Sequence, residues 1–104
     1  MADEIDQRSE RIRGWLFSRL KEAANWSSDA AKKMTKAGAE ETAYHLRVAA
    51  KNLREGHREK GIQHLEVAGK AAKSEGQRSA SAAIAQEVKK VASTTSDDFE
   101  GSPF

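Results

Sequence analysis

The chain has 104 residues, of which 33% are charged and 38% are hydrophobic, and its formal net charge at pH 7 is +2. A chain of this length folds as at most one domain with a small core. It contains no cysteine, which excludes disulfide bonds and thiolate metal ligands. Leucine, isoleucine, valine and phenylalanine are few, but the many alanines and the low net charge favour closely packed helices over disorder.

No hydrophobic stretch is long enough to cross a membrane, and the first residues lack the basic and then apolar pattern of a secretory leader. We therefore expect a soluble cytoplasmic protein that does not bind membranes. No segment alternates with period two, so we predict an all-α fold. The predicted architecture is a small antiparallel bundle of three to four Ala-rich helices in residues 1–95, with a disordered acidic C-terminal tail in residues 96–104. Because alanine interfaces bury little apolar area, we expect a homo-oligomer or a protein partner.

The first predicted helix runs from about Asp3 to Asn25 and carries an apolar stripe at helical spacing. The residues predicted to form a core or oligomer contact here are Ile12, Trp15, Leu16, Phe17 and Leu20. Three of them are consecutive and spread over more than half of the helix circumference, so one neighbouring helix cannot cover them. A membrane-surface role for this aromatic helix is an alternative, but its acidic residues would weaken attraction to anionic lipid.

Three further helices are predicted downstream. Ser27-Ser28-Asp29 is typical of a helix cap, so a second helix should begin near residue 30. Gly38 could interrupt this helix, and the sequence leaves that question open, while Glu55-Gly56 predicts its end. Apolar residues at helical spacing then predict a third helix over about 58–74 and a fourth over about 77–92.

Two groups of basic residues could contact the phosphates of a nucleic acid. The first recurs at spacings of four, three and four residues and consists of Arg47, Lys51, Arg54 and Arg58. The second consists of Lys32, Lys33 and Lys36. On a continuous helix the first group would form a basic stripe, for which the alternative is an ordinary solvated helix face. No aromatic residue interleaves with either group, which argues against base stacking on single strands and favours contacts with the backbone.

The residues with catalytic or metal-binding chemistry do not form a recognisable site. His57 and His64 would lie about two turns apart on one helix, too far to share a metal ion. The chain has no Gly-rich phosphate loop and no nucleophile with a recognisable base. We therefore predict a protein that is not an enzyme and that binds no metal and no cofactor.

The sequence ends in acidic residues followed by a Pro-Phe pair. This ending resembles the C-terminal tail of bacterial single-stranded-DNA-binding proteins, which docks helicases, nucleases and replication proteins. The resemblance covers nine of 104 residues and departs from the family at Ser102, where the family has an apolar side chain. It implies a partner-binding role for Asp97, Asp98, Phe99, Glu100, Pro103 and Phe104. No family is indicated for the helical body.

Together these features predict a non-enzymatic helical interaction protein that self-associates and acts near nucleic acid. Its basic body would contact nucleic acid, and its acidic tail would dock a protein. The alternative is a protein-binding inhibitor or assembly factor, of the kind that mobile elements encode, which uses its helical face and makes no nucleic-acid contact.

Overall fold

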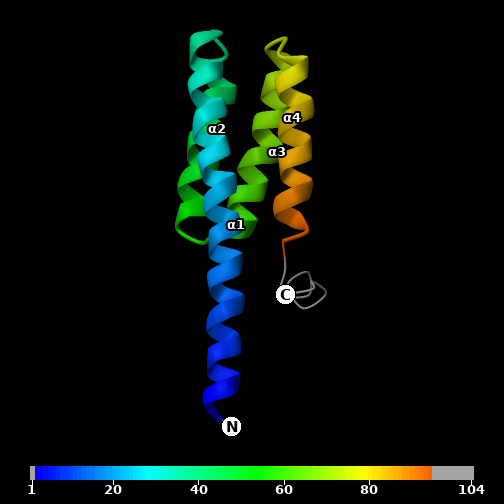
Figure 1. The fold of residues 1–104 in the computed structure, drawn as a ribbon. Helices are drawn as coiled ribbons and strands as arrows, with labels where there is room; N and C mark the ends of the chain where they lie inside the picture. The colour runs from blue at the N-terminus through cyan, green and yellow to red at the C-terminus, as the bar shows by residue number, and fades with distance from the viewer. Residues whose placement is uncertain (1, 95–104) are drawn as a thin grey trace.

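The structure is a computed structural model that describes residues 2–94, with side chains described for residue 14 and residues 16–94. These residues form four α-helices, which are α1 (Ala2–Lys36), α2 (Glu40–Arg54), α3 (Arg58–Ser74) and α4 (Arg78–Ala92). Each helix runs antiparallel to the one before it (Figure 1). The described part of the chain contains no strand, which confirms the predicted all-α class.

The four helices do not close into a symmetrical bundle. Each helix packs along the next one in the chain, whereas α1 and α4 touch only over a short stretch. Helices α2 and α3 lie behind, and α1 and α4 stand in front of them on opposite sides (Figure 1). Helix α1 has 35 residues against 15 in α2, and its N-terminal half extends well beyond the other helices.

All three connections between helices are the same three-residue turn with a glycine at its centre. Gly38, Gly56 and Gly76 have φ angles of +79°, +83° and +77°, a backbone conformation that side chains with a Cβ rarely adopt. The residue after each glycine donates its N–H to a carbonyl five residues earlier, as Ala39 does to Met34 at 2.9 Å. Gly38 therefore ends a helix. The sequence alone did not decide whether it would.

The predicted start of a new helix at Ser27-Ser28-Asp29 is wrong, because α1 continues through these residues to Lys36. Ser27 is fully buried, and its hydroxyl donates a 2.8 Å hydrogen bond to the carbonyl of Ala23 one turn earlier. This bond satisfies the hydroxyl inside the helix, so Ser27 does not cap a helix end. The predicted third and fourth helices agree with α3 and α4 to within one residue.

The core consists of a few large aliphatic side chains surrounded by alanine. Leu46 and Leu53 of α2, Leu65 of α3 and Ile84 of α4 are at most 1% exposed. Helix α1 joins this core from Leu20 onward. Of the other residues predicted for a core or oligomer contact, Leu16 is half-buried and Phe17 is 49% exposed. The side chains of Ile12 and Trp15 lie outside the described residues.

The N-terminus of α2 is capped by Glu75, a residue of the turn between α3 and α4. Its carboxylate accepts hydrogen bonds from the backbone N–H of Thr42 at 2.8 Å, from the Thr42 hydroxyl, and from the N–H of Glu41 at 3.4 Å. The first N–H groups of a helix lack partners within it, and the positive end of the helix dipole favours an anion there. The bonds from Thr42, its hydroxyl first, hold the pKa of Glu75 below its ordinary value.

We expect Glu75→Gln to lower the free energy of unfolding at pH 7, because an amide cannot supply the negative charge at this helix end. A lowered pKa means that the contribution of Glu75 is present above about pH 4.5 and is lost as the pH falls through the folded-state value. Urea denaturation followed by circular dichroism should therefore show a smaller difference from the wild type at pH 3 than at pH 7. Glu66→Gln, on the exposed side of α3, is the matched control. Equal stability of both variants at pH 7 would contradict the capping role.

Candidate interaction surfaces

A groove separates α1 from α4. It contains a cavity of about 510 Å³ at the end near Arg19 and Lys90. A second cavity of about 310 Å³ lies further along the same two helices, between Met34 and Ala80. Trp26 lines both cavities, so they form one surface, which we call the α1–α4 groove.

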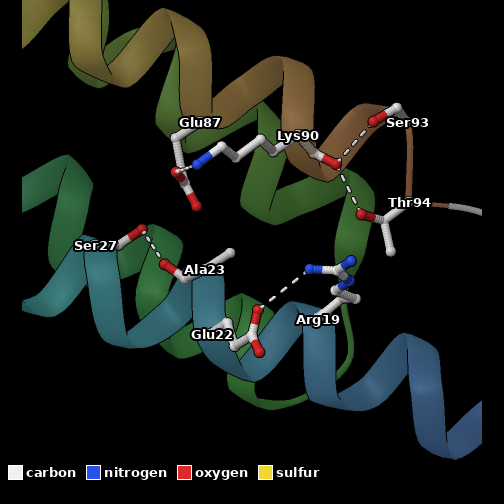
Figure 2. A network of polar contacts seen from close by, with 8 residues as sticks. All are labelled: Arg19, Glu22, Ala23, Ser27, Glu87, Lys90, Ser93 and Thr94. Carbon is white, nitrogen blue, oxygen red and sulfur yellow. Dashed lines mark hydrogen bonds and ion pairs between the residues drawn. The ribbon is translucent and has the colours of Figure 1, made fainter.

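The end of the groove near the C-terminus of α4 is charged. Figure 2 shows Arg19 and Glu22 on α1 opposite Glu87 and Lys90 on α4, with the carboxylate of Glu87 directed toward α1. Arg19 pairs with Glu22 at 3.6 Å and Lys90 with Glu87 at 4.0 Å, so each ion pair stays within one helix. Glu87 is only 8% exposed. Burial raises the pKa of Glu87, and the charge of Glu22 raises it further, while Lys90 lowers it.

The other end of the groove is largely apolar. Its lining includes Trp26, Ala30 and Met34 from α1 and Ala80, Ala83 and Ile84 from α4. Leu46 of α2 lies behind them and is itself fully buried. An open apolar groove between two helices is the shape into which proteins dock the apolar face of an amphipathic helix.

A second surface follows the line along which α1 and α2 pack. Arg47 donates a hydrogen bond to the hydroxyl of Thr35 at 3.3 Å, and Arg54 donates one to the hydroxyl of Ser28 at 2.8 Å. Lys51 lies between these arginines on the exposed side of α2, and Lys32 and Lys36 follow Ser28 at four-residue intervals on α1. We call this surface the basic seam, and it consists of Lys32, Lys36, Arg47, Lys51 and Arg54. Both hydroxyl partners are neutral, so neither hydrogen bond pairs an arginine with a negative charge.

The basic seam contains five of the seven residues that the sequence predicted for nucleic-acid contact, and the other two lie elsewhere. Lys33 lines the α1–α4 groove. Arg58 donates hydrogen bonds to the carbonyl of Val91 at 3.1 Å and to that of Ala92, at the C-terminus of α4. The terminal carbonyls of a helix lack partners and attract a cation, so Arg58 acts as a cap for α4.

No protein-family model, no curated protein and no solved structure matches this chain. No helix among residues 2–94 is long and apolar enough to cross a membrane. The tail residues predicted to bind a partner, Asp97, Asp98, Phe99, Glu100, Pro103 and Phe104, lie outside the described residues.

The two histidines that the fold brings together are His45 and His64, and not His57 and His64, which are seven residues apart in the sequence. His45 of α2 stacks on His64 of α3, with ring centroids 5.8 Å apart and an interplanar angle of 22°. The Nδ1 atoms of both rings are buried without a hydrogen-bond partner. Within the described residues, no group of three or more His, Cys, Asp or Glu side chains could hold a metal ion. The stacked rings therefore serve as a packing contact between α2 and α3.

Proposed function

We propose that this chain is a non-enzymatic helical interaction protein that binds the phosphate backbone of a nucleic acid along the basic seam. The observation that supports this proposal is the fold-back at Gly38. It brings the lysines of α1 beside the basic residues of α2 on one exposed face, although the two groups are separate in the sequence. Within the described residues, none of the five side chains is engaged in an ion pair. Glu40 lies on the same side of α2 near its first turn and limits the seam at that end.

The seam favours contacts with phosphates over recognition of bases. One exposed aromatic side chain, Tyr44, lies one turn before Arg47 and is 57% exposed. A single ring gives far less stacking than the successive aromatic platforms of proteins that bind single strands. Lysine and arginine on a helical surface instead replace the counterions of the backbone, so binding should be strongly dependent on salt and weakly dependent on sequence.

The test is the binding of labelled duplex and single-stranded DNA by fluorescence anisotropy between about 50 and 200 mM salt. We expect Lys32→Glu/Lys51→Glu to weaken binding and to reduce the slope of log affinity against log salt by about two. The matched control is Lys70→Glu/Lys89→Glu, which changes the charge equally at exposed positions of α3 and α4. Absence of binding at low salt, or equal losses in both double variants, would refute a role for the seam.

A second function, capture of a protein through the α1–α4 groove, is favoured by the apolar lining that Trp26, Met34 and Ala83 leave accessible. A partner helix with apolar side chains at positions i, i+3 or i+4, and i+7 would cover this lining. This function corresponds to the inhibitor or assembly-factor alternative and requires no nucleic acid.

The acidic tail remains part of the proposal as a docking segment for a protein partner. Deletion of Phe104 should abolish capture of that partner and leave the helical circular dichroism spectrum unchanged. If a chain without the tail captures the partner as well as the full chain does, the tail has no docking role.

A further inference from the structure

Helix α1 extends far beyond the helices against which it packs (Figure 1). Leu20 is the first of its described side chains to be buried. We call residues 2–18 the α1 overhang, which at 1.5 Å per residue is about 26 Å long. An isolated helix of this length is marginal in water, because most helical stability in proteins comes from packing of an apolar face. The overhang therefore needs a surface to pack against.

The end of the overhang nearest the bundle presents apolar surface without a full covering. Phe17 is 49% exposed and Leu16 is half-buried. In the sequence, isoleucines occur four and eleven residues before Leu16, at positions 12 and 5, which is the spacing of one helix face. An apolar face of this kind on a protruding helix is typical of a contact with another molecule.

The overhang is about as long as the α1–α4 groove of the same molecule. The α1–α4 groove follows α4, whose 15 residues are about 22 Å long. The overhang carries an apolar face at helical spacing, and the groove is largely apolar at its end between Met34 and Ala80. We propose that the α1–α4 groove binds the α1 overhang of a second copy of this chain, with the two α1 helices antiparallel. This inference rests on the second function given above, the capture of a helix by the groove.

The charges along α1 favour this arrangement over a parallel one. Acidic residues lie in the first two turns of the helix at Asp3, Glu4 and Asp6, whereas its last turns carry the exposed Lys33 and Lys36. In an antiparallel pair with its two-fold axis near Arg19, the acidic end of each α1 lies beside the basic end of the other. A parallel pair would place like charges side by side.

The antiparallel register also brings apolar positions together. With the axis near Arg19, residue i of one α1 lies opposite roughly residue 39 − i of its partner, because both helices rise equally per residue. Leu16 then lies opposite Ala23, and Ile12 lies opposite Ser27, next to Trp26. Each overhang fills the groove of the other copy, so the contact is used twice and the assembly closes as a symmetric dimer.

The first test is the mass of the full chain by sedimentation velocity and equilibrium over a range of concentrations. The wild type should show twice the monomer mass of 11.4 kDa. Ala83→Arg, at an exposed position that lines the groove, should weaken self-association at least tenfold. Ala85→Arg, exposed on the opposite side of α4, should leave the dimer intact. Circular dichroism at the same concentrations checks that both variants fold.

The second test addresses the register. Lys33→Glu should weaken the dimer, and Asp6→Lys in the same chain should restore it, because the reversed pair is again complementary. The chain contains no cysteine, so Arg19→Cys introduces a unique thiol close to the proposed two-fold axis. A short bifunctional maleimide should link two Arg19→Cys chains and should fail to link two Lys33→Cys chains.

Three outcomes would overturn the inference. They are a wild type that stays monomeric, a dimer that Ala83→Arg leaves intact, and cross-linking through Lys33→Cys as efficient as through Arg19→Cys. A monomeric chain that loses capture of a protein partner on Ala83→Arg would overturn the dimer alone and leave the second function standing. DNA binding through the basic seam is measured separately and does not depend on either result.

Discussion

Gly61→Ala should destabilise the protein by about 1 to 3 kcal/mol, whereas the same substitution at Gly69 should stabilise it by about 0.5 to 1 kcal/mol. Both glycines lie inside α3, where alanine is the better helix former. A methyl group at Gly61 would overlap Cδ2 of Leu53 and lie 2.6 Å from its Cγ, and Leu53 is fully buried in the core. At Gly69 the nearest atom would be Cγ2 of Ile84 at 3.5 Å, an ordinary contact.

The two variants have equal changes in composition, so their difference isolates the close approach of α2 to α3. Urea denaturation at pH 7 should be followed by circular dichroism at one protein concentration, because self-association would also change the apparent stability. A Gly61→Ala variant as stable as Gly69→Ala would mean that Leu53 can move aside. In that case the close packing of α2 on α3 would not restrict this position to glycine.

The sequence predicted the helices best where local chemistry alone decides the backbone. Gly56 and Gly76 end helices in the predicted places because a residue with positive φ must follow the last turn. The prediction at Ser27 was wrong because a serine hydroxyl can either cap a helix or bond to a carbonyl of the preceding turn. Which of the two occurs depends on whether the serine is buried, and the local sequence does not show burial. Ser27 is fully buried, and its hydroxyl uses the carbonyl of Ala23.

The candidate surfaces were predicted only in part, since both depend on how helices pack. The spacing of the basic residues assumed a continuous helix from Arg47 to Arg58, but the turn at Gly56 reverses the chain and directs Arg58 to the end of α4. The contribution of Lys32 to the same face as Lys51 requires the fold-back at Gly38. No local sequence pattern predicts the α1–α4 groove, because the groove forms where two helices that are far apart in the sequence diverge in space.

Glu87→Gln should raise the free energy of unfolding at pH 7 by about 1 kcal/mol, because an amide of the same shape avoids the cost of burying an ionised carboxylate. Glu87 lies in the wall of the groove, facing Arg19 and Glu22 of α1, with Lys90 on its own helix. Its pair with Lys90 is long, at 4.0 Å, and Lys90 is largely exposed. This pair compensates only weakly for the burial of the carboxylate.

The pH dependence of this gain distinguishes a buried charge from a change in packing. The folded-state pKa of Glu87 is raised above its ordinary value of 4.5, so the wild-type carboxyl is tolerated while it is protonated and becomes unfavourable as the pH rises through the folded-state pKa. The advantage of Glu87→Gln should therefore be near zero at pH 4 and largest at pH 7. This sign is opposite to that expected for Glu75, whose contribution is lost in acid. Urea denaturation at both pH values, with Glu66→Gln as control, measures the difference. If the gain in the free energy of unfolding is equal at the two pH values, the effect comes from packing and not from the charge.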